Sequence, residues 1–166
     1  MSKLIIIRGN SGSGKSSAAK GLQKRIGRNT LVIAQDTVRR EMLWARDGYN
    51  TTALPLLIAL LRYGYENNEV VILEGILHSG WYKPLFETAV QLFGADIYAY
   101  YYDIPFEETL KRHETKTQKL EFGETEMRRW WNEKDFIGII PEKTITKDIS
   151  LEAAIDMILS DIQNNE

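Results

Sequence analysis

The eight residues GNSGSGKS at positions 9–16 connect a short apolar run to a segment with helical spacing. The apolar run is Leu4–Arg8, and the helical segment is Lys15–Ile26, which is followed by Gly27. The connection matches the pattern G-x-x-x-x-G-K-[ST], in which glycines let the backbone approach a phosphate and the N–H groups of a helix start point at the anion. A strand, this loop and a helix in that order predict an α/β fold built around a phosphate-binding loop, or P-loop.

Segments typical of strands and of helices alternate along the rest of the chain. Further strands are expected at Thr30–Ala34, Val70–Leu73, Ile97–Tyr102 and Lys143–Thr146. Helices are expected at Thr37–Arg46, Thr51–Glu66, Tyr82–Phe93, Pro105–Glu114, Glu124–Glu133 and Ser150–Ile162, the last with Ser150 as its N-cap. Continuous apolar strands between helices are typical of a parallel sheet covered on both faces. We therefore expect one domain over residues 1–166 with a three-layer α/β P-loop NTPase fold, a parallel sheet of about five strands, and a helical lid at about residues 111–135.

The composition narrows the classes of function. The chain has 166 residues, of which 43% are hydrophobic and 27% charged, as is usual for soluble globular proteins. It has no cysteine, which excludes disulfides, thiolate metal sites and a cysteine nucleophile. Its net charge of −2 disfavours binding to long nucleic acids, although a short 5′ end or a nucleotide sugar stays possible.

The hydropathy pattern predicts no contact with a membrane. The longest apolar run, Leu54–Leu61, falls far short of the roughly 20 residues of a spanning helix. Leu4–Ile7 is too short for the apolar part of a secretory signal. We therefore expect a cytoplasmic protein, and the sequence leaves its oligomeric state open.

The P-loop motif predicts a nucleotide as ligand, with ATP and Mg²⁺ as cofactors. Lys15 would reach the β- and γ-phosphates, and the Ser16 hydroxyl would bind Mg²⁺. The alternative is a turn rich in glycine and serine that happens to precede Lys-Ser. The residues expected to bind the ATP phosphates are Gly9, Asn10, Ser11, Gly12, Ser13, Gly14, Lys15, Ser16 and Ser17.

A short chain with one P-loop has the size of a small-molecule kinase. Asp135–Gly138 fits the D-x-x-G motif of GTPases, but it follows a segment with helical rather than strand character. Thr146–Asp148 resembles the guanine-binding motif only loosely, so we interpret both matches as coincidence. A GTPase is therefore the less favoured alternative to a kinase, and an ATP-binding regulator without phosphotransfer is another.

Acids that follow the strands are candidates for chemistry, because ligands of open parallel sheets bind beyond the carboxyl ends of the strands. Asp36 is the candidate general base for an acceptor hydroxyl, and its alternative role is an N-cap for a helix from Thr37. Glu74 would hold Mg²⁺ together with Ser16, through water, or contact the acceptor. Its alternative role is that of an ordinary acid where a strand meets solvent. Asp103, before Ile104 and Pro105, is expected to be a turn or cap residue.

Two cations of the expected lid are candidates for neutralising the transferred phosphoryl group. Arg112 and Lys116 lie four residues apart on one helix face, where like charges repel unless an anion lies between them. The alternative is a solvated charged face in which Glu108 pairs with Arg112. The sequence leaves open whether Arg112, Lys116, Arg128 or Arg129 acts on the nucleotide.

The hydroxyl-bearing acceptor is expected near Asp36. Arg39 and Arg40 follow it, and a guanidinium suits a phosphate or carboxylate on the acceptor. The alternative is a surface salt bridge with Glu41. Trp44 and His78 are further candidates for acceptor binding, with core packing and an ordinary loop histidine as their alternatives. Tyr49 and Tyr63 are also candidates for the acceptor pocket, with core packing as their alternative. Trp130 and Trp131 are expected to pack the lid on the body.

The chain resembles a group of P-loop phosphotransferases that includes zeta-toxin kinases, bacteriophage polynucleotide kinase and chloramphenicol phosphotransferase. The resemblance spans roughly residues 3–150 and rests on the P-loop, Gln35–Arg40, and lid segments at 112–116, 121–123, 127–131 and 135–138. It implies a kinase activity in which Asp36 is the general base and Arg39 contacts the acceptor. The lid of the group often has Arg-Pro where this chain has Lys116 and Thr117.

Overall fold

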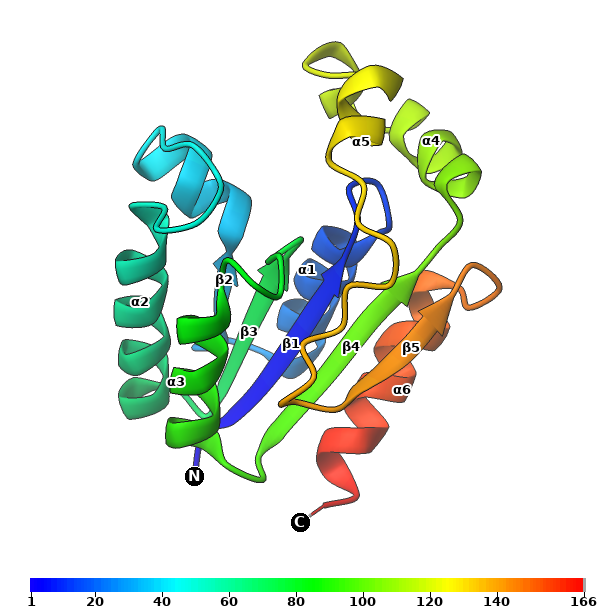
Figure 1. The fold of residues 1–166 in the computed structure, drawn as a ribbon. Coiled ribbons are helices and arrows are strands. Elements are labelled where there is room, and N and C mark those ends of the chain that lie inside the picture. Colours follow the sequence, from blue (N-terminus) through cyan, green and yellow to red (C-terminus); the bar gives the residue numbers. More distant parts are fainter. Residues whose placement is uncertain (166) are drawn as a thin grey trace.

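Five strands form one parallel sheet in the computed structural model, which describes residues 1–165 (Figure 1). The spatial order is β2-β3-β1-β4-β5, with β1 in the centre. The expected α/β fold with a five-stranded parallel sheet is thus confirmed. The strands are β1 (Lys3–Gly9), β2 (Leu31–Ala34), β3 (Val70–Gly75), β4 (Ile97–Asp103) and β5 (Glu142–Thr146).

The central strand is apolar throughout because both faces of the sheet are covered. Side chains alternate along a strand, so Leu4 and Ile6 pack on one face while Ile5 and Ile7 pack on the other. The first face is covered by α2 (Ala53–Asn67) and α3 (Lys83–Phe93). The second face is covered by α1 (Lys15–Ile26) and α6 (Leu151–Gln163), which gives three layers (Figure 1).

The segment after β4 forms an arm above the carboxyl ends of the strands (Figure 1). It consists of α4 (Phe106–Glu114), the short 3₁₀ helix η2 (Thr117–Leu120) and α5 (Glu124–Arg129). The arm has its own aromatic cluster, in which Phe122 stacks on His113 and meets Trp130 edge to face. This packing holds the arm together, and the arm includes most of the segment expected to form a lid.

The helix expected over Thr37–Arg46 begins at Thr37 but ends earlier, at Met42. The segment Thr37–Met42, η1, is a π-helix, in which the Leu43 N–H donates to the carbonyl of Val38, five residues back, at 3.2 Å. The chain then leaves the helix, and Trp44 has a left-handed φ of 49°. Apolar spacing does not report hydrogen-bond register, so the sequence could not distinguish this short, wide turn from a longer α-helix.

The other elements agree with expectation to within a few residues. The helix Lys15–Ile26 has the expected bounds, and Ser150 caps α6 by accepting a hydrogen bond from Ala153 N at 3.1 Å. The helix expected over Glu124–Glu133 ends earlier, at Arg129. Within residues 1–165, no helix combines the length and the apolar character needed to cross a membrane.

Candidate active site

The P-loop lies between β1 and α1 in a conformation that depends on its glycines. Gly12 and Gly14 have φ of 79° and 108°, in the left-handed region. A Cβ on Gly12 would lie 2.7 Å from the carbonyl oxygen of Thr109, so the arm packs directly on this glycine. Gly14 precedes the first turn of α1, where unpaired N–H groups attract anions. The loop therefore has the geometry of an anion-binding site.

Lys15 and Ser16 place their side chains above the end of the sheet. The Lys15 ammonium donates to the Asn10 carbonyl at 3.2 Å, which folds the side chain back over the loop. The Ser16 hydroxyl donates to Glu74 Oε1 at 3.1 Å. Glu74 reaches this position because it pairs in register with Ile7, two residues before the loop. Ser16 and Glu74 therefore lie next to each other, as the sequence predicted.

Glu74 is buried at the end of β3. Only 5% of its surface is exposed. Burial raises the pKa of Glu74 above its usual 4.5, although the Lys15 charge and the Ser16 hydrogen bond act in the opposite direction. A buried carboxylate next to a hydroxyl at a helix start offers the hard oxygen ligands that Mg²⁺ prefers. The residues therefore fit a magnesium ion that is shared with a bound phosphate and water.

Arg112 connects the arm to the P-loop. Its Nη1 donates to the Ser13 carbonyl at 2.5 Å, and its Nε lies 3.3 Å from Glu108 Oε1. Arg112 therefore forms the ion pair with Glu108 on its own helix and also lies beside the P-loop. The Nη2 atom also lies 3.5 Å from the carbonyl of Lys147, in the loop before α6. Arg112 thus bridges three segments around the start of α1.

Lys116 shares a cavity with Lys15 and Glu74. Burial lowers the pKa of Lys116 below its usual 10.5, and the charges of Lys15 and Arg112 act in the same direction. Glu74 opposes them only in part. Lys116 borders the loop cavity with Lys15 and the lid cavity with Arg112, and an anion bound between these cations would relieve their repulsion.

Asp36 lies two residues after β2, and its side chain makes no cap bond, so the alternative role as an N-cap is not observed. Its backbone is already helical, with φ −63° and ψ −39°, and this directs the carboxylate away from the N–H groups ahead of it. The carboxylate instead lies 3.5 Å from Arg39 Nη2 and 3.8 Å from Arg40 Nε. Asp36 therefore keeps an accessible carboxylate beside the P-loop.

Three adjoining cavities surround the P-loop. We call them the loop cavity, the arginine cavity and the lid cavity, with volumes of about 400, 570 and 270 Å³. The loop cavity is bounded by Lys15, Ser16, Asp36, Glu74 and Lys116, among others. The arginine cavity is bounded by Lys15, Asp36, Arg39, Arg46, Arg129 and Trp81, among others. The lid cavity is bounded by Gly14, Ser17, Tyr102, Arg112, Lys116 and Lys147, among others.

The loop cavity is the middle one of the three. It shares Lys15 and Asp36 with the arginine cavity, and it shares Lys116 with the lid cavity. The cavities therefore adjoin one another around the P-loop. A long ligand in the lid and loop cavities would end beside whatever occupies the arginine cavity.

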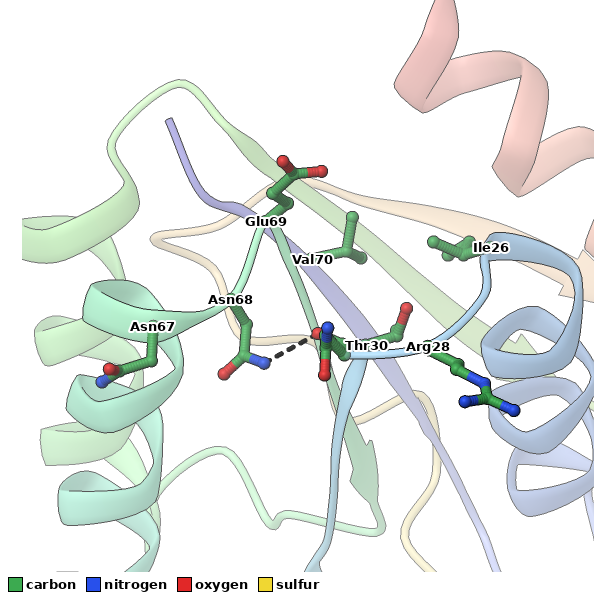
Figure 2. Close-up of a pocket in the computed structure, with 8 residues that line it drawn as sticks. Ile26, Arg28, Thr30, Asn67, Asn68, Glu69 and Val70 are labelled. Atoms are coloured by element: carbon green, nitrogen blue, oxygen red, sulfur yellow. Dashed lines mark hydrogen bonds between the residues drawn. The ribbon is translucent and has the colours of Figure 1, made fainter.

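A further cavity, of about 340 Å³, lies at the opposite end of the sheet (Figure 2). It lies between the end of α1 and the start of β3, where Asn68 Nδ2 donates to the carbonyl of Asn29 at 2.7 Å. Of the described residues that line it, Arg28 and Glu69 are the charged ones, with opposite signs. Ligands of open parallel sheets bind at the other end, so this cavity is not the candidate site.

Arg8, the last residue before the P-loop glycine, has a structural role that was not predicted. Its side chain is fully buried between Phe86 and Tyr101. It pairs with Asp135 Oδ2 and Glu142 Oε1, each at 2.8 Å. Asp135 in turn accepts from the N–H and hydroxyl of Ser79, so its carboxylate is held in a buried network beside Arg8. A charged residue at the end of an otherwise apolar strand was the available signal.

A second missed network anchors the loop after η1. Asp47 accepts hydrogen bonds from the Tyr82 hydroxyl at 2.5 Å and from Gln35 Nε2 at 3.2 Å. Arg39 Nε lies 3.9 Å from the same carboxylate. The network fixes Arg39 relative to β2 and α3. Nothing in the local sequence around Asp47 signalled it, because its partners lie on other elements.

The aromatic candidates lie outside the cavity beside Asp36. Trp44 is 93% exposed and lines a shallow groove that also includes Arg40 and Trp130. His78 accepts from the Gly80 N–H through Nδ1 at 3.2 Å and stacks on Trp81. Trp81 is the aromatic residue that reaches the arginine cavity from this loop. The guanidinium of Arg40 lies over the rings of Phe122 and Trp130 and so contacts the arm.

Tyr49 and Tyr63 are exposed, and Tyr49 meets Trp81 edge to face. Trp131 packs edge to face on Phe106, at the start of α4. The rings that Trp130 and Trp131 meet, Phe122 and Phe106, belong to the arm itself. The expected packing of the lid on the body is seen at Trp130, whose ring lies under the Arg40 guanidinium.

Comparison with solved structures identifies the fold. No family model matches the chain, and no curated protein matches it by sequence. A gluconokinase from Sinorhizobium meliloti superposes with a TM-score of 0.69 at 16% identity over 98% of this chain and 92% of the other. An APS kinase from Mycobacterium tuberculosis gives 0.67 at 18% identity over 98% of both chains. The tunicamycin resistance protein of Deinococcus radiodurans gives 0.63 at 18% identity over 98% and 96%. The chain therefore has the fold of the P-loop kinases.

Proposed function

We propose that this protein transfers the γ-phosphoryl group of Mg-ATP to a hydroxyl group of a small molecule. The observation that carries the proposal is that Lys15 and Asp36 border both the loop cavity and the arginine cavity. A cation for the transferred group and a carboxylate for the attacking hydroxyl are thus available at one junction. Phosphoryl transfer requires little else than such positioning and charge neutralisation.

The nucleotide would occupy the lid and loop cavities. The P-loop N–H groups, Lys15 and Lys116 would bind the phosphates. The adenine of ATP would lie in the lid cavity, beside Tyr102 and Arg112 and close to Lys147. The convergence of Lys15, Arg112 and Lys116 supports this placement, because the repulsion among them is relieved by a polyphosphate.

Ser16 and Glu74 would hold Mg²⁺, the serine directly and the carboxylate through water. Bound there, the ion would neutralise charge on the β- and γ-phosphate oxygens. Because their hydroxyl and carboxylate are already 3.1 Å apart, the two side chains need little rearrangement to share one ion.

Asp36 would act on the acceptor. As the acceptor oxygen bonds to the γ-phosphorus, the bond from that phosphorus to the bridging oxygen breaks and ADP leaves. The acceptor proton goes to the Asp36 carboxylate. Arg39 and Arg40 hold this carboxylate in place through contacts of 3.5 and 3.8 Å.

Similar structures support a small acceptor. Their names include gluconokinase, APS kinase and shikimate kinase, and the APS kinase was solved with AMPPNP and APS. These names describe small molecules rather than polymers. The narrower resemblance to zeta-toxin kinases, polynucleotide kinase and chloramphenicol phosphotransferase stays a prediction, as does the cytoplasmic location.

The test is transfer of label from γ-labelled ATP and Mg²⁺ to a panel of acceptors. The panel contains nucleosides, nucleotide sugars, 5′-hydroxyl oligonucleotides, sugars and antibiotics. We expect label on an acceptor with the wild type, and its loss in Asp36→Asn with ATP binding retained. Asp156→Asn, an exchange on the exposed face of α6, is the matched control and should behave as wild type.

Two results would contradict the proposal. Tight ATP binding with no transfer to any acceptor would favour a nucleotide-binding regulator. Competition of GTP with ATP at equal or higher affinity, together with GTP hydrolysis, would favour a GTPase.

A further inference from the structure

The arginine cavity carries an excess of positive charge on a chain whose net charge is −2. Its cationic side chains are Lys15, Arg39, Arg40, Arg46 and Arg129. Its anionic side chains are Asp36 and Asp47. The excess is local, and the cavity of about 570 Å³ is of a size that holds a small molecule.

Three of these cations already have roles. Lys15 belongs to the P-loop and faces the nucleotide phosphates. Arg39 is oriented by Asp36 at 3.5 Å, by Asp47 at 3.9 Å and by a bond from its Nη1 to the Ala45 carbonyl at 3.2 Å. Arg40 lies over the rings of Phe122 and Trp130. The excess charge therefore depends on the other two arginines.

Arg46 and Arg129 lack such partners. Among the side chains that the structure describes, which exclude those of residues 117, 118 and 166, neither arginine side chain has a hydrogen-bond or ion-pair partner. Glu126, the carboxylate whose charge acts on Arg129, has its own partner, because it accepts from the Gly123 N–H at 2.9 Å. Two exposed arginines without a hydrogen-bond or ion-pair partner among the described side chains thus line one cavity.

The backbone on both sides of the cavity is anchored. The carbonyl of Arg46 accepts from the Thr51 hydroxyl at 2.7 Å, and Asp47, the next residue, accepts from Tyr82 and Gln35. Arg129 ends α5, and three residues later Asn132 is held to the P-loop by two hydrogen bonds to Asn10. The two arginines therefore extend from fixed positions on the body and on the arm.

We propose that the phosphoryl acceptor is a small alcohol that carries a second, oxyanionic group, and that Arg46 and Arg129 bind this group. Guanidinium groups bind phosphate, sulfate and carboxylate through paired N–H donors. Binding of the nucleotide does not require these two arginines, since it would be bound by the P-loop, Lys15, Lys116 and Arg112. The inference rests on the proposed kinase function and specifies its substrate class. Arg46 and Arg129 would be specificity-determining residues.

The test compares pairs of acceptors that differ in the anionic group. Suitable pairs are a nucleoside and its monophosphate, glycerol and glycerol phosphate, and a sugar and its sugar acid. The wild type should favour the anionic member by at least about tenfold in kcat/KM, as expected for a charged hydrogen bond. The phosphate and carboxylate pairs separate the two sources of the oxyanion.

Variants test whether the two arginines bind the oxyanionic group of the acceptor: Arg46→Gln, Arg129→Gln and the double variant. The double variant should raise KM for the anionic acceptor at least about tenfold and leave KM for ATP unchanged. Arg28→Gln, an exposed arginine at the opposite end of the sheet, is the matched control. Transfer that is equally fast to the uncharged members, and unchanged in the double variant, would overturn the inference while leaving the kinase function intact. Transfer only to 5′-hydroxyl oligonucleotides would also overturn it.

A binding measurement decides the inference if no acceptor in the panel is phosphorylated. Inorganic phosphate is titrated by calorimetry into protein saturated with Mg²⁺ and AMPPNP, so that the P-loop is occupied. Binding that is lost in the Arg46→Gln, Arg129→Gln double variant supports the inference. Absent binding, or binding unchanged in that variant, overturns it. Failure to bind AMPPNP itself would instead contradict the proposed function.

Discussion

Asn10 in the P-loop and Asn132 beyond the arm hold each other by two hydrogen bonds. Asn10 Nδ2 donates to the Asn132 carbonyl at 2.7 Å, and the Asn132 N–H donates to Asn10 Oδ1 at 2.8 Å. The Asn10 side chain, which is 5% exposed, thus uses both of its polar atoms on the backbone of one residue. The phosphate-binding loop and the segment that returns from the arm are therefore joined directly.

Asn10→Ala should break this connection. It leaves a backbone N–H and a carbonyl of Asn132 without partners, which should lower the free energy of unfolding by about 1–3 kcal/mol. It should also raise KM for ATP, because the P-loop loses a support. Urea unfolding and steady-state kinetics measure the two effects. Asn67→Ala, which removes one exposed hydrogen bond to the Tyr63 carbonyl, is the control, and equal losses in both variants would contradict the prediction.

Arg8→Met should be among the most destabilising single changes in the chain. It removes a cation with an exposed side-chain fraction of 0% and leaves Asp135 and Glu142 without their partner. Removing one member of a buried ion pair costs about 3–5 kcal/mol. Arg25→Met, which breaks exposed pairs with Glu152 and Asp156, should cost less than about 1 kcal/mol. Equilibrium unfolding compares the two, and a similar small cost for both would show that the buried pair adds little.

Glu74→Gln should stabilise the unliganded protein at neutral pH. Burial raises the pKa of Glu74 in the folded state above 4.5, so the folded protein disfavours the charged form. The free-energy cost of charging Glu74 is absent below pH 4.5, grows between pH 4.5 and the folded-state pKa, and is complete above it. The gain from Gln should therefore be present at pH 7 and disappear toward pH 4.

Unfolding of the Glu74→Gln and wild-type proteins across this range measures the gain, with exposed Glu69→Gln as control. The variant should at the same time lose phosphotransfer, because Glu74 is proposed to hold Mg²⁺. A variant that is less stable than the wild type at pH 7 would contradict the account of Glu74.

Lys116→Met should weaken ATP binding without destabilising the unliganded fold. Burial and the nearby Lys15 lower the pKa of Lys116, which shows that its charge is disfavoured until an anion is present. Loss of one charged contact to phosphate should raise the Kd of ATP at least about tenfold. Lys119→Met, an exchange at an exposed position on η2, is the matched control. Equal ATP affinity in the two variants would exclude Lys116 from the nucleotide site.

Local sequence predicted the elements that depend on local chemistry. The P-loop motif and the helical spacing after it located α1, and the apolar strands predicted a parallel sheet because both faces must be covered. Placing Ser16 beside Glu74 needed only the rule that ligands bind beyond the carboxyl ends of strands. Arg112 beside the P-loop was likewise among the expected alternatives.

The contacts that the sequence did not reveal join distant positions. Arg8 meets Asp135, 127 positions away, and Asn10 meets Asn132, 122 positions away. Such pairs form only after the sheet has brought β1 and the segment after the arm together. The π-helical turn at Thr37–Met42 was missed for another reason, since apolar spacing does not distinguish a bond to the fifth residue from one to the fourth.

The most direct test of the kinase proposal is the fate of the γ-phosphoryl group when ATP is consumed. Mass spectrometry of the acceptor and quantification of ADP give the ratio of phosphorylated product to ADP in the same reaction. We predict one phosphorylated acceptor for each ADP with the wild type, and neither product with Asp36→Asn. Formation of ADP and inorganic phosphate, with every acceptor unchanged, would contradict phosphotransfer as the function of this site.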